Sequence, residues 1–137
     1  MKIIDDKLLN SVTEQAKESP RLRMNYNFHH SLDEKCHRFL NAVEPRTEVP
    51  IHKHPTKDET FVILRGKVRV TTHNDDGSII EDVVLCADEG RYGVNILKGV
   101  WHTIKVMEPN SCIFECKEGP FVEHEEDGIL HLPESRN

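Results

Sequence analysis

The chain has 137 residues, a net charge of −6 at pH 7 and a hydrophobic fraction of 36%. This length suits one folded domain, and apolar runs such as Phe61-Val62-Ile63-Leu64 exclude a disordered chain. The negative charge argues against general nucleic-acid binding. The sequence has no long apolar stretch and no secretory leader, so we expect a cytoplasmic protein that does not contact the membrane.

The first predicted element is an N-terminal helix. Apolar residues recur at helical spacing from Leu8 to Ala16, and Pro20 cannot continue a helix. Acidic residues at the start of this segment suit the positive end of a helix dipole. The pattern predicts an amphipathic helix over residues 5–19.

Residues 21–29 then alternate strictly between polar and apolar side chains, which predicts a strand with two unlike faces. The polar face consists of Arg21, Arg23, Asn25, Asn27 and His29. Guanidinium groups suit forked contacts with carboxylate or phosphate, and Asn side chains suit sugar hydroxyls. Two interpretations stay open: this face is either a solvated outer surface or a wall that faces a ligand.

A second short helix is predicted after the polar strand. Ser31 and Glu34 have the spacing of a capping box. Apolar residues from Leu32 to Val43 then follow a helical stripe that ends before Pro45.

From Thr47 onward, segments rich in Val, Ile, Thr and Phe alternate with turn residues. The predicted strands lie at residues 47–53, 59–65, 67–73, 79–86, 92–97, 100–107 and 111–117. Such a series predicts a mainly β sandwich or barrel. We expect a single domain over 1–137, with the helices and polar strand in 1–45, the barrel in 46–117 and an acidic C-terminal tail in 118–137.

The cysteines contain no C-x-x-C pair and do not resemble the disulfide framework of a secreted protein. They are Cys36, Cys86, Cys112 and Cys116. Buried, reduced thiols are therefore expected. On the last predicted strand Glu115 and Lys117 share one face, and the nearby cysteines share the other.

Histidine is unusually frequent, and His52 and His54 lie two residues apart, so on a strand both rings project from one face. A turn follows, and Glu59 opens the returning strand. His102 supplies a third imidazole on a later strand. Three His and one Glu suit Zn²⁺, Mn²⁺, Fe²⁺ or Ni²⁺, and the alternative is a metal-free barrel.

Other aromatic positions are interpreted as structural. Trp101 precedes His102 and is expected to point to the opposite face, into the core, with stacking against a sugar as the alternative. The remaining histidines are expected on the surface: His30, His37, His73, His124 and His131.

The spacing His52-x-His54, four residues, Glu59, six residues, Gly66 resembles the first motif of the cupin superfamily, and Gly99-x-x-His102 is similar to its second. The resemblance implies a double-stranded β-helix, or jelly-roll barrel, that holds one divalent metal ion (Zn, Fe, Mn or Ni) on three His and Glu59. The chain departs from the motifs at Arg46 and Leu97, where turn-forming Gly and Pro are usual.

A closer resemblance, to the WbuC-type cupin-fold metalloprotein family, covers most of the chain. It rests on the polar strand, on Arg38-Phe39-Leu40-Asn41-Ala42, on Leu64-Arg65-Gly66, on Gly99-Val100-Trp101-His102-Thr103 and on residues 114–121. Members of that family often lie among genes for surface-polysaccharide synthesis. The resemblance therefore implies a small anionic sugar or nucleotide-sugar ligand of polysaccharide or lipopolysaccharide metabolism.

Two functions are consistent with these features. The first is a metal-dependent enzyme, an isomerase, epimerase or oxygenase, in which Arg21, Arg23, Asn25 and Asn27 bind the substrate and His29 moves a proton. The second is a non-catalytic module that binds a sugar or small acid in the same pocket. A homodimer is expected in either case, because small jelly rolls expose sheet edges that need cover.

Overall fold

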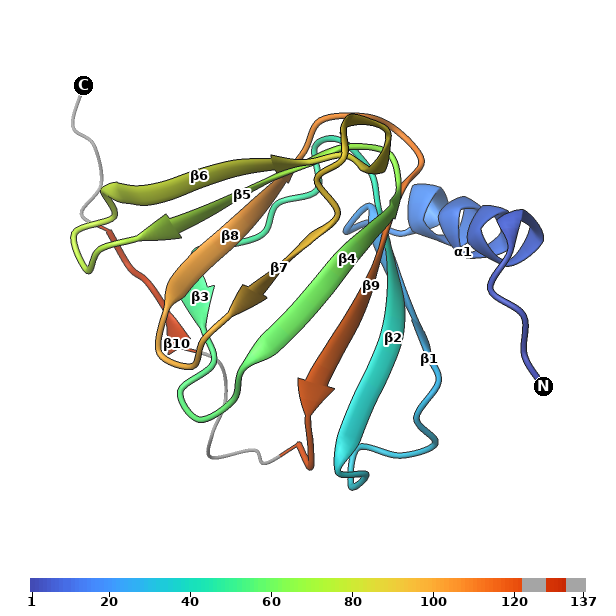
Figure 1. Cartoon of the computed structure of the whole chain (residues 1–137), viewed down its shortest axis with the longest axis horizontal. Coiled ribbons are helices and arrows are strands. Elements are labelled where there is room, and N and C mark those ends of the chain that lie inside the picture. The colour runs from blue at the N-terminus through green and yellow to red at the C-terminus, as the bar shows by residue number, and fades with distance from the viewer. Residues whose placement is uncertain (122–127, 133–137) are drawn as a thin grey trace.

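The computed structural model describes residues 1–121 and 128–132 and consists of two antiparallel sheets with one long helix beside them (Figure 1). The first sheet has the order β1 (Arg23–Asn27), β2 (Cys36–Val43), β9 (Ser111–Glu118), β4 (Glu59–Arg65), β7 (Gly93–Ile96). The second has the order β10 (Gly128–Ile129), β3 (His52–Lys53), β8 (Trp101–Val106), β5 (Val68–His73), β6 (Ile79–Leu85). The predicted mainly β class is confirmed.

The helix α1 (Asp6–Glu18) confirms the first prediction, and Asp5 caps it by accepting a hydrogen bond from the backbone N–H of Leu8 at 3.0 Å. Its buried face packs on the outer side of the first sheet, where it contacts β1, β2 and β9. The buried side chains of this layer are Leu9, Val12, Ala16, Leu40, Ala42 and Cys112. The outer side of this sheet is therefore a second apolar layer, separate from the barrel interior.

The predicted polar strand is β1, which pairs antiparallel with β2. The apolar side chains of Met24 and Tyr26 pack into the layer beneath α1. Because side chains alternate along a strand, Arg23 and Asn25 face the other way, toward the second sheet. This face of β1 is the start of the pocket described below.

The second predicted helix is wrong: Cys36–Val43 form β2, a strand between β1 and β9. Leu40 and Ala42 pack against α1, while Val43 belongs to the barrel core. Both faces of β2 are thus largely covered, so its apolar residues do not alternate with polar ones as in a half-buried strand. Ser31 and Glu34 instead stabilise the turn before β2, where the Glu34 carboxylate accepts from the N–H of His30 at 2.6 Å.

Most of the later strands lie where the sequence predicts them, with two differences. Within the predicted strand 47–53 the structure has only His52–Lys53 as β3, since Pro50 has no N–H to donate to a ladder. In the predicted acidic tail Gly128–Ile129 form β10, which pairs with β3. Residues 122–127 and 133–137 of that tail lie outside the described residues.

The barrel interior is apolar at one end and polar at the other. Its fully buried apolar side chains are Val43, Phe61, Ile63, Val68, Val70, Leu85, Ile96, Val106 and Ile113. Burial of each such side chain stabilises the fold by about 1.5–3 kcal/mol. The other end is polar, because β4, β8 and β9 bring the buried side chains of Glu59, His102 and Glu115 inward.

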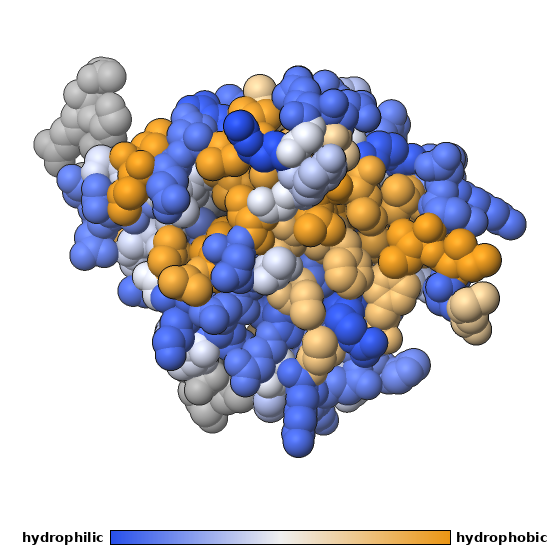
Figure 2. Space-filling view, viewed as in Figure 1, coloured by the Kyte–Doolittle hydropathy of each residue, from blue (hydrophilic) through white to orange (hydrophobic). Residues whose placement is uncertain are grey.

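The surface is mixed in character. Figure 2 shows apolar residues gathered across the middle of the face seen in Figure 1, with hydrophilic residues around them. No helix among the described residues is long and apolar enough to cross a membrane.

Candidate metal centre

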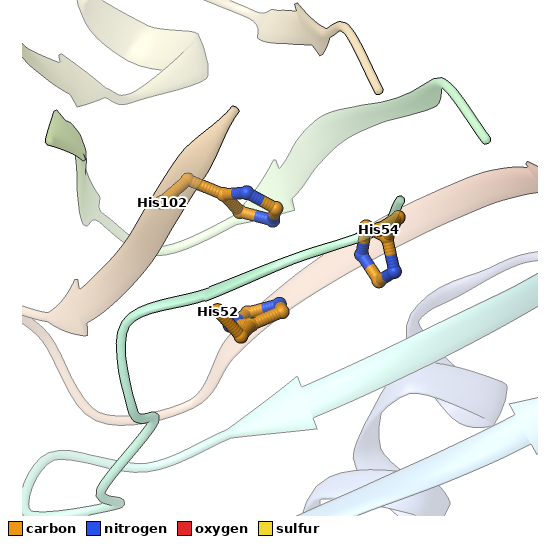
Figure 3. A group of neighbouring side chains, drawn as sticks. All are labelled: His52, His54 and His102. Atoms are coloured by element: carbon orange, nitrogen blue, oxygen red, sulfur yellow. The ribbon is translucent and has the colours of Figure 1, made fainter. Parts of the chain in front are cut away.

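Three histidines converge inside the polar end of the barrel. His52 on β3 lies directly opposite His102 on β8, and His54 follows two residues after His52. Their ligand nitrogens all lie within 4.8 Å of one another, and the rings of His52 and His102 are 4.3 Å apart between centroids. Figure 3 shows the three rings turned toward a common point. Three of the predicted ligands therefore lie together in the fold.

Backbone carbonyls fix the orientation of two of these rings. His52 Nδ1 lies 2.9 Å from the carbonyl oxygen of Pro50, and His102 Nδ1 lies 2.9 Å from that of Val100. A carbonyl only accepts, so each Nδ1 carries the proton and each Nε2 keeps its lone pair. This is the usual second contact of a metal-binding imidazole, which sets the tautomer and the direction of the ring.

His102 Nε2 is buried and finds no hydrogen-bond partner in the part of the chain that the structure describes. A buried polar atom without a partner costs about 1–3 kcal/mol, so such atoms are rare unless something else binds them. Burial, followed by the nearby rings of His52 and His54, lowers the pKa of His102, which keeps it neutral at pH 7. A neutral imidazole with an exposed lone pair fits a metal ligand.

Glu59 joins the group through His54, since its carboxylate lies 2.5 Å from His54 Nε2. The hydrogen bond that Asp58 accepts from the N–H of Lys98, at 2.8 Å, fixes the turn between the two residues. Burial alone would raise the pKa of Glu59, but the hydrogen bond and charge of His54 lower it to about 2. Glu59 is therefore an anion at neutral pH and fits a hard fourth ligand.

The histidines line one side of a cavity of about 200 Å³, and the first sheet forms the opposite wall. Besides Glu59, the polar side chains on that wall are Arg23, Asn25, Asn41, Glu115 and Lys117. Asn41 donates from Nδ2 to Glu115 at 3.3 Å, and its Oδ1 is buried without a hydrogen-bond partner among the described residues. Burial, followed by repulsion from Glu59, raises the pKa of Glu115 well above its usual range.

The predicted substrate residues do not all reach this cavity. Arg23 and Asn25 line it, whereas Arg21, Asn27 and His29 are not part of its lining. Arg21 and Asn27 are exposed, so the polar face of residues 21–29 faces the cavity at its centre and solvent at its ends. The solvated interpretation therefore holds for the ends of the strand, and a ligand-facing role for its centre stays a prediction.

His29 occupies a structural position beside the cavity. Its Nδ1 accepts from the N–H of Arg38 at 3.1 Å, and its ring stacks on His37 at 4.3 Å between centroids. Phe39, which does line the cavity, lies between the two regions with its ring 6.2 Å from that of His29. The residue predicted to move a proton is thus held in a stack with a second imidazole.

Three other aromatic positions differ from expectation. His37 and His73 are buried, not on the surface. His73 bonds to Thr71 and to the carbonyl of Gly77, which satisfies both ring nitrogens. Trp101 points away from His102 as predicted but is only half-buried, because its Nε1 donates to Asp75 at 2.8 Å on the outer face.

Asn41 is a polar cavity residue that the sequence did not indicate. The helix predicted over this segment hides the alternation that places Phe39 and Asn41 on one face of β2. Glu115 and Lys117 were predicted to share a face, and both line the cavity. They could be assigned to the pocket only once β9 was known to lie between β2 and β4.

A family model described as a domain of unknown function, DUF6016, matches residues 4–85. No curated protein matches the chain.

The capsular polysaccharide assembling protein CapF of Staphylococcus aureus is 21% identical with a TM-score of 0.63, over 80% of this chain and 30% of CapF. The cupin domain of Schizosaccharomyces pombe Cnp3 is 12% identical with a TM-score of 0.54, over 70% of this chain and 64% of that one. A 3,4-ketoisomerase of Helicobacter canadensis is 15% identical with a TM-score of 0.54, over 64% of each chain. The predicted cupin fold is confirmed. The chain spans about a third of CapF, and the WbuC-type resemblance stays a prediction.

Proposed function

The chain belongs to the DUF6016 family, whose description states no function, and from its histidine pocket we propose a metal-dependent cupin that acts on a small anionic, sugar-like molecule. The observation that carries this proposal is the convergence of His52, His54 and His102 within 4.8 Å inside a cavity. Two of the rings are oriented by carbonyls, as ligands are.

The donor set suits one divalent ion, with His52, His54 and His102 as nitrogen ligands and Glu59 as the carboxylate ligand. Zn²⁺, Fe²⁺, Mn²⁺ and Ni²⁺ all accept such a mixture of imidazole and carboxylate. When bound, the ion supplies Lewis acidity that polarises a carbonyl or hydroxyl oxygen of a ligand. The role of these four residues as metal ligands is part of the proposal and rests on their geometry.

The wall opposite the histidines is suited to the ligand class. Arg23 and Lys117 bring two positive charges to the cavity, so an anionic group is the ligand feature that they favour. Asn25 and Asn41 offer amide groups, and the buried Oδ1 of Asn41 accepts a hydrogen bond that a ligand hydroxyl supplies. One anionic group and neighbouring hydroxyls together describe a sugar phosphate, a sugar acid or a nucleotide sugar.

The comparisons support this class. One protein of similar fold is described as a capsular polysaccharide assembling protein and another as a 3,4-ketoisomerase. The first description agrees with the setting of the WbuC-type family, surface-polysaccharide synthesis, and the second names an isomerase. We therefore place isomerisation or epimerisation of a sugar intermediate first among the reactions of this pocket.

A non-catalytic binding module is the second candidate, and the position of His29 favours it. The predicted proton carrier is stacked on His37 outside the cavity lining, so it does not touch a ligand there. A binding module needs the same ion and the same polar wall but no proton carrier.

The test is a panel of sugar phosphates and nucleotide sugars presented to the purified, metal-loaded protein. Calorimetry measures binding, and NMR of the mixture measures turnover. We expect metal-dependent binding of at least one anionic sugar in wild type and none in His102→Leu. A rearranged sugar identifies an enzyme, and binding without product identifies the module. Binding that is equal with and without the metal, or absent from the whole panel, contradicts the proposal.

A further inference from the structure

Two cysteines that are far apart in sequence meet on the first sheet. Cys36 begins β2 and Cys116 lies near the end of β9, and their Sγ atoms are 3.7 Å apart although 80 positions separate them in the chain. The register pairs Arg38 with Cys116 and Cys36 with Glu118, so the two cysteines are diagonal neighbours on one face. Figure 1 shows the start of β2 and the end of β9 side by side, at the end of the sheet away from α1.

The surroundings of the pair differ from those of the other cysteines. Cys36 is exposed and Cys116 is half-buried, whereas Cys86 and Cys112 are buried. Burial raises the pKa of the Cys112 thiol to about 11, which makes it unreactive. Cys112 shares the face of β9 that carries Cys116, but it lies beneath α1. The chain thus carries two accessible thiols in contact and two inert ones.

We propose that Cys36 and Cys116 are a reversible oxidation site, at which a peroxide converts the two thiols into a disulfide. The proposal is independent of the metal and of the ligand proposed for the pocket. A disulfide bond is about 2.05 Å long, so the two sulfurs must approach by about 1.7 Å from their present contact. Rotation of the exposed Cys36 side chain at the start of its strand is the movement available for this approach.

The chemistry balances with the peroxide as the two-electron oxidant. The Cys36 thiolate attacks one peroxide oxygen, which gives a sulfenic acid at Cys36 and releases the other oxygen as water after protonation. The Cys116 sulfur then attacks the sulfenic sulfur, the S–S bond forms, and the hydroxyl leaves as a second water with the thiol proton. Burial, followed by the contact with Cys36, raises the pKa of Cys116, so the exposed Cys36 is the better candidate for the first attack on the peroxide.

The disulfide would lie on the outer side of the wall that lines the pocket. Cys116 stands between Glu115 and Lys117 in sequence, and both of these side chains point to the cavity while Cys116 points away. The bond would therefore join β2 to β9 behind the pocket and leave its polar groups in place. We expect the oxidised protein to keep its histidine cluster and to unfold at a higher temperature, because the link restricts the unfolded chain.

The experiment treats reduced wild-type protein with a small excess of hydrogen peroxide, then alkylates and digests it without reductant. Wild type should lose about 2 Da, yield one linked peptide pair containing Cys36 and Cys116, and return to four alkylated thiols after dithiothreitol. The Cys36→Ser and Cys116→Ser variants should form no such link, while Cys86→Ser serves as the matched control that keeps it.

The disulfide is looked for in wild-type protein first, so the test of the proposal does not depend on whether a cysteine variant folds. Four unmodified thiols after treatment, a link that involves Cys86 or Cys112, or a bond between two chains would each overturn it. A Cys36 that stops at the sulfinic acid would overturn it as well, because Cys116 would then not be the partner.

Discussion

His102 combines an oriented imidazole with a buried nitrogen that has no hydrogen-bond partner in the described part of the chain. His52 has the same backbone contact, from Nδ1 to a carbonyl two residues earlier. Without an ion the three rings crowd together and bury a lone pair, which opposes folding. A bound ion would remove this cost, so metal binding and folding stability should be coupled at this point.

Removal of the metal should therefore destabilise the wild-type protein. A ligand at a concentration 100-fold above its Kd stabilises the folded state by about 2.7 kcal/mol, and a chelator abolishes that stabilisation. Thermal unfolding with and without a chelator measures the effect. The matched variant is His102→Leu, whose unfolding should not respond to the chelator. Equal responses in the two proteins would place the metal elsewhere.

Metal affinity should also depend on pH, because each imidazole must be neutral to bind an ion. Burial, followed by the neighbouring His52, lowers the pKa of His102 below the ordinary value of 6.5. The neutral form of His102 therefore persists in the folded state to lower pH than in the unfolded chain. We expect affinity to be level above about pH 6.5 and to fall below it. Competition titrations across this range measure it, and an affinity that is unchanged down to pH 5 would argue against imidazole ligands.

Arg23 and Arg21 allow a matched test of the polar strand. Arg23 lines the cavity and donates to the carbonyl of Glu48 at 2.8 Å, whereas Arg21 is exposed. A charge-assisted contact is worth about 1.5–3 kcal/mol, so Arg23→Ala should weaken the binding of anionic sugars about tenfold or more. Arg21→Ala should leave it unchanged. Ligand-induced shifts in melting temperature with phosphate, citrate and sugar phosphates measure the difference. Identical shifts in both variants would mean that Arg23 does not contact the ligand.

At the scale of elements, β2 determines how much of the pocket the sequence reveals. Its apolar residues fit a helical stripe, because one face is covered by α1 and the other by the barrel. The periodicity of apolar residues distinguishes a strand from a helix only when one face of the element is exposed to solvent. The wrong element then concealed Asn41, whereas α1 and β1, each with one polar face, were predicted correctly.

A pair of leucines distinguishes the strand from the predicted helix. On a helical stripe both Leu32 and Leu40 would be buried, but in the structure Leu40 is fully buried beneath α1 and Leu32 is 55% exposed. Leu40→Ala should lower the free energy of unfolding by about 2–5 kcal/mol. Leu32→Ala should change it by no more than about 0.5 kcal/mol. Urea unfolding of both variants measures these free energies, and equal losses of stability would support the predicted helix over the strand.

The histidine cluster was predictable for a different reason. His52, His54 and Glu59 lie close in sequence, so a strand, a turn and a returning strand bring them together without knowledge of the rest of the fold. His102 lies on a strand much later in the chain, so its place beside the other two histidines depends on the pairing of β3 with β8. The ends of the polar strand could not be assigned from alternation, which gives the face of a residue but not how far along the strand the cavity extends.

At the scale of the whole molecule, the two sheets leave one side open between the edge strands β6 and β7. An apolar hollow of about 220 Å³ lies between them, lined by Val70, Val83, Val94 and Ile96. Ile79 and Ile80 on β6 are more than half exposed nearby. Exposed edges with apolar side chains are a surface that proteins usually cover.

The predicted homodimer stays a prediction, and this open side is where we expect it. Light scattering at micromolar concentration should give about twice the 15.8 kDa mass of the chain. Ile80→Asp should shift the protein toward the monomer, while Ile4→Asp, at an exposed position before α1, should not. A wild-type mass near 15.8 kDa would contradict the prediction.

The metal content of the purified protein tests the central claim most directly. Elemental analysis of wild type should find about one divalent ion per chain, as the three-histidine cluster requires. The triple variant His52→Ala, His54→Ala, His102→Ala should carry none, and a His30→Ala control, at an exposed position, should carry the wild-type amount. Circular dichroism confirms that each protein is folded. A folded triple variant that still holds about one ion per chain would contradict the assignment.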